Sequence, residues 1–145
     1  MEMLPKRILL AADGSKDSKL ALQMAASMAG GLGSELHVMY VALISPWVLG
    51  GKLSDTEYDR LRSEQQRFLD DLVSQVEVMG VKVTESHFRV GQRADDEIIQ
   101  LSEDLDVDLI VVGSKGRGTL KRALMGSDAE SVVRYSRHPV MVVRG

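Results

Sequence analysis

The sequence D-L-I-V-V-G-S-K-G, residues 108–116, places a continuous apolar run directly before a glycine-rich loop. A short apolar run without alternation is typical of a strand covered on both faces, as in a parallel sheet. Residues 7–12, R-I-L-L-A-A, have the same form and are followed by the turn sequence Asp13-Gly14-Ser15. Both stretches therefore predict buried strands that end in polar turns.

Three further strands are expected at residues 35–43, 81–90 and 139–143. Helical patterns separate the five strands: one that Gly30 and Gly31 close, a long amphipathic one over 54–79, one over 94–105, and one that Gly126 and Ser127 open. Alternating strands and helices imply right-handed crossovers. We predict an α/β fold with an open five-stranded parallel sheet of order 3-2-1-4-5, helices on both faces, and a single domain over residues 1–145.

Ligands of open α/β sheets bind beyond the carboxyl ends of the strands, where the strand order reverses. With the order 3-2-1-4-5, the turn at Asp13 and the loop at Gly113 face each other at that point. Glycines at 113, 116, 118 and 126 allow backbone N–H groups to approach phosphate oxygens. The helix that begins near Ser127 favours an anion at its first turn. Basic residues at 115, 117, 121 and 122 complete a predicted polyphosphate cradle.

Two better-known phosphate motifs are absent from this loop. A Walker A motif needs lysine after Gly118, where Thr119 stands, and a GxGxxG fingerprint that starts at Gly116 needs glycine where Lys121 stands. The sequence therefore supports neither P-loop hydrolysis nor NAD chemistry.

Composition excludes several classes of protein. The 145 residues are 44% apolar and 27% charged, with a net charge of −3, which argues against a general affinity for nucleic acid or membrane. No apolar run approaches the ~18 residues of a membrane span, and the run at 8–12 is too short for a signal peptide, so we expect a cytoplasmic protein. The chain has no cysteine, and its three histidines are far apart, so we expect them in strands or loops rather than as metal ligands.

The spacing Gly113-x2-Gly116-x9-Gly126-Ser127 resembles the G-2x-G-9x-G-(S/T) signature of the ATP-binding branch of the universal stress protein (UspA-like) family. The stretches I-L-L-A-A-D-G-S at 8–15, V-G at 90–91 and L-I-V-V-G-S at 109–114 agree in order and spacing, as does the ending over 126–143. The resemblance covers essentially the whole chain.

This resemblance implies roles for individual residues. Asp13 would contact the ribose or a phosphate-bound metal, and backbone near Val41 would meet the adenine edge. ATP is the implied ligand, with AMP or ADP as alternatives and Mg or Mn as the accompanying metal. The implied nucleotide-binding residues are Ala12, Asp13, Val41, Gly113, Ser114, Lys115, Gly116, Gly118, Gly126, Ser127 and Asp128.

Structural explanations compete with several of these roles. Asp13 could cap its own turn, and Ser127 with Glu130 matches a capping box that needs no ligand. Lys115 and Arg117 could be solvated loop charges, and Trp47 could be a partly exposed loop residue. Asp128 departs from the resemblance, because the family usually has an uncharged residue there. Its carboxylate would repel a triphosphate unless it points outward or reaches a cation.

Three functions remain open. The first is an ATP-binding regulatory or stress-response protein with little or no hydrolysis. The second is a slow ATPase or nucleotidyl-transfer enzyme, for which Asp13 is the one visible candidate base. The third is an interaction module that binds no nucleotide. In each, we expect a homodimer through the final strand, Pro139 to Val143, because a hydrophobic strand at a sheet edge invites pairing. The resemblance implies the same dimer.

Overall fold

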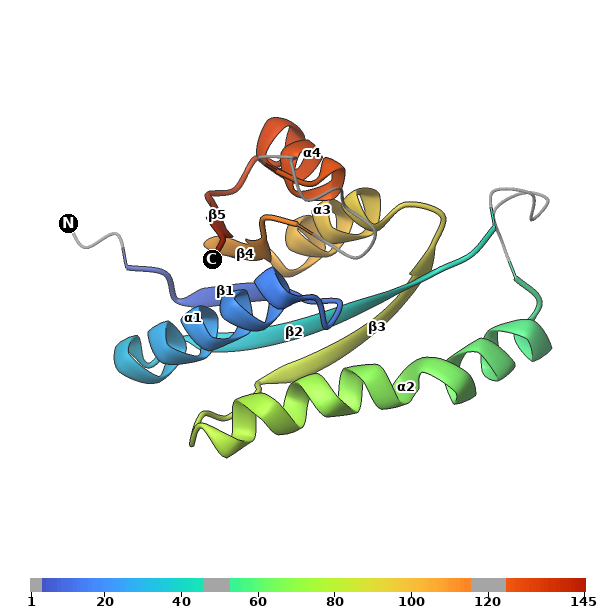
Figure 1. Ribbon diagram of the computed structural model, residues 1–145, viewed down its shortest axis with the longest axis horizontal. Helices are drawn as coiled ribbons and strands as arrows, with labels where there is room; N and C mark the ends of the chain where they lie inside the picture. The colour runs from blue at the N-terminus through green and yellow to red at the C-terminus, as the bar shows by residue number, and fades with distance from the viewer. Residues whose placement is uncertain (1–3, 46–52, 116–124) are drawn as a thin grey trace.

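The computed structural model describes residues 4–45, 53–115 and 125–145. Strands and helices alternate along these residues, as the sequence predicts (Figure 1). The elements are β1 (Arg7–Ala11), α1 (Lys16–Leu32), β2 (Glu35–Leu43), α2 (Asp55–Val78), β3 (Glu85–Gly91), α3 (Ala94–Leu105), β4 (Leu109–Gly113), α4 (Ser127–Tyr135) and β5 (Val140–Val143).

The five strands form one parallel sheet in the order β3-β2-β1-β4-β5, which confirms the predicted topology. Alternating side chains of β1 enter two different cores. Ile8 and Leu10 pack with α1 and α2 on one face, and Leu9 packs with α3 and α4 on the other. Helices therefore cover both faces, and the reversal of strand order falls between β1 and β4.

Several boundaries differ from the sequence-based prediction, and two of the differences have a consequence for the chain path. Strand β3 begins at Glu85 rather than at residue 81. Helix α1 does not close at Gly30 and Gly31 but continues to Leu32 and ends at Gly33, whose φ of 70° is the left-handed C-cap conformation. Gly33 donates its N–H to the carbonyl of Ala29, so this glycine closes the helix.

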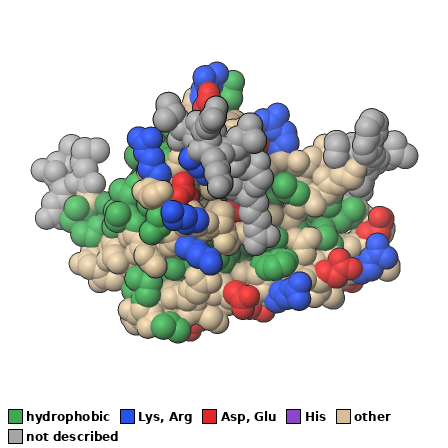
Figure 2. All heavy atoms as spheres, viewed as in Figure 1, with side chains coloured by type: hydrophobic (Ala, Val, Ile, Leu, Met, Phe, Trp, Pro, Cys, Tyr) green, Lys and Arg blue, Asp and Glu red, His purple; other side chains and the backbone are tan. Residues whose placement is uncertain are grey.

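Helix α2 begins at a capping box, in which Ser54 and Glu57 exchange side-chain and backbone hydrogen bonds. Acidic and basic side chains are interspersed on the part of the surface that α2 forms in the view of Figure 2. This agrees with the interpretation of its charges as a solvated face. No helix within the described ranges combines the length and the apolar character that crossing a membrane requires.

Candidate functional site

A cavity of about 610 Å³ opens at the carboxyl ends of the central strands. Its volume falls within the roughly 300–1,000 Å³ typical of small-molecule and cofactor sites. Most of the described site residues that the sequence singles out line it: Ala12, Asp13, Val41, Gly113, Lys115, Gly126, Ser127 and Asp128. We name this cavity the cleft.

Of the remaining predicted residues, only Ser114 is among those that the structure describes. Ser114 is 1% exposed and is absent from the cleft lining; its N–H donates to the carbonyl of Val143. Gly116 and Gly118 lie outside the described residues, as do Trp47, Arg117, Lys121 and Arg122.

The turn after β1 is held by its own side chains. The Oδ1 atom of Asp13 accepts the backbone N–H of Ser15 at 2.9 Å, and the N–H of Asp13 donates to the Oγ of Ser18 at 2.9 Å. Ser15 also caps α1, because its Oγ accepts the N–H of Ser18. Asp13 therefore caps its own turn, which is the role that needs no ligand, and it also lines the cleft.

The loop after β4 is docked onto the beginning of α1. The N–H of Lys115 donates to the Asp17 carboxylate at 3.2 Å, and the Oγ of Ser15 donates to the carbonyl of Lys115 at 3.2 Å. A Cβ atom on Gly113 would lie 2.6 Å from the backbone nitrogen of Ser18. Glycine is therefore required at 113 by the close approach of β4 to α1, independently of any ligand.

The N-cap residue of α4 makes no side-chain hydrogen bond to the helix. That residue is Gly126, which has no side chain, and Ser127 is already the first helical residue. The capping box predicted for Ser127 and Glu130 is therefore wrong. A capping hydroxyl must stand one position before the helix, and Gly126 holds that position. The Glu130 carboxylate pairs instead with Arg134 at 3.3 Å. Backbone N–H groups at such an end favour an anion.

Asp128 is turned toward a neighbouring helix. Its carboxylate accepts a hydrogen bond from the backbone N–H of Asp95 in the first turn of α3, whose own N-cap residue, Arg93, supplies no side-chain cap. The Asp128 side chain is exposed, but the protein atoms around it desolvate the carboxylate. This desolvation raises its pKa, and the nearby charges of Asp95 and Asp13 add to the effect.

Asp95, by contrast, is buried and strongly partnered. The Arg93 guanidinium donates to both of its oxygens, at 2.7 and 3.1 Å, and Ser131 and the N–H of Asp96 donate as well. These bonds, led by Arg93, lower the pKa of Asp95 despite its burial. The network joins the beginnings of α3 and α4 along one wall of the cleft.

The other end of the cleft is apolar. Met39, Val41, Leu43 and Ile98 line it, together with Tyr40, whose hydroxyl donates to the Oε1 of Gln65 at 2.8 Å. Sequence reasoning selected Val41 here but missed Gln65, because a glutamine on an amphipathic helix carries no local signal of a site. The cleft therefore offers an apolar end and a helix N-terminus to one ligand.

Comparisons with known proteins agree on one family. Residues 5–144 match the model of the "Universal stress protein family". Universal stress protein MJ0531 of Methanocaldococcus jannaschii is 33% identical over 147 residues, which covers 99% of this chain and 84% of that protein.

Solved structures match over almost the full length. The structure of protein MJ0577 is 26% identical, with a TM-score of 0.77 and coverage of 98% of this chain and 97% of that one. A universal stress protein in complex with cAMP gives a TM-score of 0.74 at 23% identity, covering 97% of each chain. One from Archaeoglobus fulgidus in complex with dAMP gives 0.69 at 22%, covering 97% of this chain and 98% of that one.

Proposed function

This chain belongs to the universal stress protein family, and from that premise we propose that it binds an adenine nucleotide in the cleft. The observation that carries the proposal is that one cavity combines the N-terminus of α4, where the N-cap residue is glycine, with an apolar end. A nucleotide has the matching halves: an anionic phosphate chain and a flat, largely apolar base. The cAMP and dAMP complexes of two similar folds support the same ligand class.

In the proposed arrangement the phosphates lie at Gly126 and Ser127, where backbone N–H groups and the helix dipole attract negative charge. The base lies toward Val41, and Ala12 and Asp13 lie between the two ends. We propose ATP as the principal ligand. Asp13 and Asp128 place carboxylate oxygens at the cleft, so the residues present fit a nucleotide-bound Mg or Mn, with Asp13 as its protein contact.

The protein acts, in this proposal, as a regulatory dimer with little or no hydrolysis. Water activation needs a general base within hydrogen-bond reach of the attacking water. Asp13 is the candidate, but its Oδ1 already accepts the N–H of Ser15. Asp128 already accepts the N–H of Asp95. The cleft thus holds and orients a nucleotide better than it activates water.

The proposal is tested by calorimetric titration of nucleotide-stripped protein with ATP, ADP and AMP, with and without Mg²⁺. Valine at 113 is a poor loss-of-function variant, because its Cβ would strike backbone of α1. Val41→Phe is preferable, since it fills the apolar end from a strand position. Val133→Phe is the matched control, because Val133 is 47% exposed on α4 and outside the cleft lining.

Saturable binding by the unmodified protein and by Val133→Phe, lost in folded Val41→Phe, is the expected result. A failure of the unmodified protein to bind any of the three nucleotides at millimolar concentration would overturn the proposal. That result would favour the third hypothesis from the sequence, an interaction module that binds no nucleotide.

A further inference from the structure

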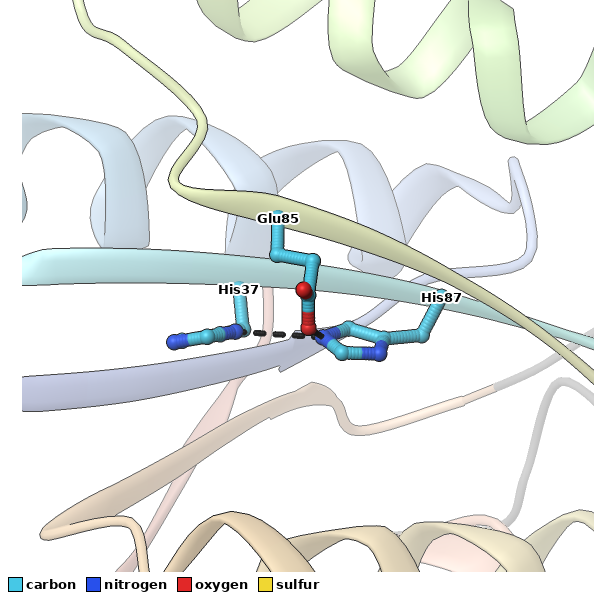
Figure 3. A group of neighbouring side chains, drawn as sticks. All are labelled: His37, Glu85 and His87. Atoms are coloured by element: carbon cyan, nitrogen blue, oxygen red, sulfur yellow. Dashed lines mark hydrogen bonds and ion pairs between the residues drawn. The ribbon is translucent and has the colours of Figure 1, made fainter.

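A cluster of metal-ligating side chains lies away from the cleft, between β2 and β3. His37 comes from β2, and Glu85 and His87 come from β3, with His37 directly opposite Glu85 in the parallel register. All three occupy the first three residues of their strands, whereas the cleft opens at the strands' carboxyl ends. Figure 3 shows the three side chains converging on one point.

The distances fit a small cation. The Nδ1 atom of His37 lies 3.1 Å from the Nε2 of His87, and that Nε2 lies 3.2 Å from the Oε1 of Glu85. One ligand atom from each residue lies within 4.8 Å of the others. Zn²⁺ bonds of about 2.0–2.1 Å at tetrahedral angles put neighbouring ligand atoms about 3.3–3.4 Å apart. Two of the three distances between ligand atoms are therefore close to those of a tetrahedral Zn²⁺ site. The third distance, between His37 and Glu85, can be adjusted by the exposed Glu85 side chain.

Hydrogen bonds alone do not satisfy all the polar atoms of this cluster well. The Nε2 of His87 faces both the Nδ1 of His37 and a carboxylate oxygen of Glu85. If that nitrogen carries a proton, one N–H must serve two acceptors. If it carries a lone pair, it can accept from His37, but the lone pairs of Glu85 then face it at 3.2 Å. A cation at the centre would accept all three lone pairs at once.

The surroundings keep both imidazoles in the form that binds metal. Burial lowers the pKa values of His37 and His87, which favours the neutral imidazoles that bind metal. The charges of Arg7 and Arg89 act in the same direction, and those of Glu35 and Glu85 oppose it. Both arginines are ion-paired, Arg7 with Glu35 and Arg89 with Asp104, which limits their repulsion of a cation.

The imidazole of His37 is almost completely buried. It is 6% exposed, and its second ring nitrogen, Nε2, is buried without a hydrogen-bond partner among the described residues. Its polar interactions are therefore concentrated at Nδ1, on the side of His87 and Glu85. A strong bond at Nδ1 would offset the cost of burying the ring.

We propose that His37, Glu85 and His87 bind one divalent transition-metal ion at the amino-terminal ends of β2 and β3. Zn²⁺ is the ion that we expect there. Two imidazoles and one carboxylate are a three-residue ligand set that Zn²⁺ uses, with water at the fourth position. Because β3 is an edge strand of the sheet, the bound ion would stabilise the pairing of this strand with β2. The site is independent of the cleft and of the nucleotide proposed there.

The test is calorimetric titration of ZnCl₂ into tag-free, EDTA-treated, nucleotide-free full-length protein, with melting temperature as a second readout. Glu85→Gln and His87→Gln each remove one ligand. His138→Gln is the matched control, since His138 is outside the cluster and lies 3.6 Å from Asp106.

We expect one Zn²⁺ per chain, a melting temperature that Zn²⁺ raises and EDTA restores, and affinity weakened about tenfold or more in both ligand variants. The His138 variant should bind as the unmodified protein does. If His87→Gln fails to fold, the affinity of Glu85→Gln tests the proposal alone. The Glu85 side chain is exposed, so its replacement should not disturb the packing of the core. No saturable binding by the unmodified protein, or equal affinity in Glu85→Gln, overturns the proposal.

Discussion

The carboxylate of Asp128, in the first turn of α4, accepts the backbone N–H of Asp95, in the first turn of α3. Helix α3 lacks a side-chain cap from its own N-cap residue, so Asp128 supplies one from another helix. This contact explains why a carboxylate stands at a position where the sequence resemblance implies an uncharged residue. It also places a negative charge beside the proposed phosphate site.

Replacement of Asp128 by asparagine should stabilise the nucleotide-free protein slightly at neutral pH. The amide oxygen can still accept the N–H of Asp95, while the desolvated charge near Asp95 and Asp13 is removed. The folded-state pKa of Asp128 is raised, so the ionised form costs stability above that pKa. The cost disappears as the pH falls below the unfolded value of about 3.9.

Thermal melts of both proteins from pH 3 to pH 8 measure this difference. The gain at pH 7 should stay below about 1 kcal/mol, because the side chain is exposed and its charge is screened. A variant less stable than the unmodified protein at pH 7 would mean that the cap needs the full carboxylate charge.

The same substitution should strengthen binding of a triphosphate more than binding of a monophosphate. The ionised Asp128 repels each added phosphate charge, and repulsion grows with the charge of the ligand. We expect several-fold tighter ATP binding and little change for AMP, measured by calorimetry without divalent metal. Glu130→Gln is the control, because it removes a charge from α4 outside the cleft lining. Equal gains for ATP and AMP would argue against phosphates at the α4 N-terminus.

Alanine at 113 should destabilise the fold whether or not nucleotide is present. Its Cβ would lie 2.6 Å from the nitrogen of Ser18 and 2.7 Å from the carbonyl carbon of Asp17, and neither backbone atom can move alone. Overpacking of this kind costs about 1–3 kcal/mol, which lowers the melting temperature by about 2–4 °C per kcal/mol for a chain of this size.

The control for this prediction is Gly31→Ala. A Cβ at Gly31 meets nothing within 4 Å inside helix α1, so the change should stabilise the protein by about 0.5–1 kcal/mol. Equal melting temperatures for the 31 and 113 variants would contradict the close approach of β4 to α1.

The topology could be predicted because local signals repeat along the chain. Apolar runs at β1 and β4 end in polar turns, and the two turns meet at the reversal of strand order. Asp13 and Gly126 could be placed at the cleft on that basis, whereas Val41 was implied by the resemblance to the family. By contrast, the end of α1 was misplaced because Gly30 and Gly31 fit inside the helix, and the left-handed conformation that ends it is that of Gly33.

Other features depend on contacts between distant segments and had no local signal. Asp128 and Asp95 are 33 residues apart in sequence, and their hydrogen bond follows from the packing of α4 beside α3. The same holds for His37 and His87, which the β2–β3 register brings together although the sequence predicts no metal ligand among the histidines. Packing between elements that are distant in the sequence, rather than motif spacing, creates both contacts.

Strand β5 lies at the edge of the sheet, and on this basis we predict that the protein forms a homodimer through this strand. The carbonyls of Pro139 and Val143 accept N–H groups of Ile110 and Ser114, on the side of the sheet. Because alternate residues of a strand point their backbone groups in opposite directions, Val140 and Val142 direct theirs to the open edge.

Val142→Pro should therefore remove an outward N–H, and with it the dimer, while the β4–β5 pairing is kept. Val142→Ala is the control, since it shortens the side chain but retains the N–H. Sedimentation velocity over a concentration series should show dimers for the unmodified protein and for the alanine variant, and monomers for the proline variant. A monomeric unmodified protein at tens of micromolar, or a proline variant that dimerises normally, would place any self-association on another surface.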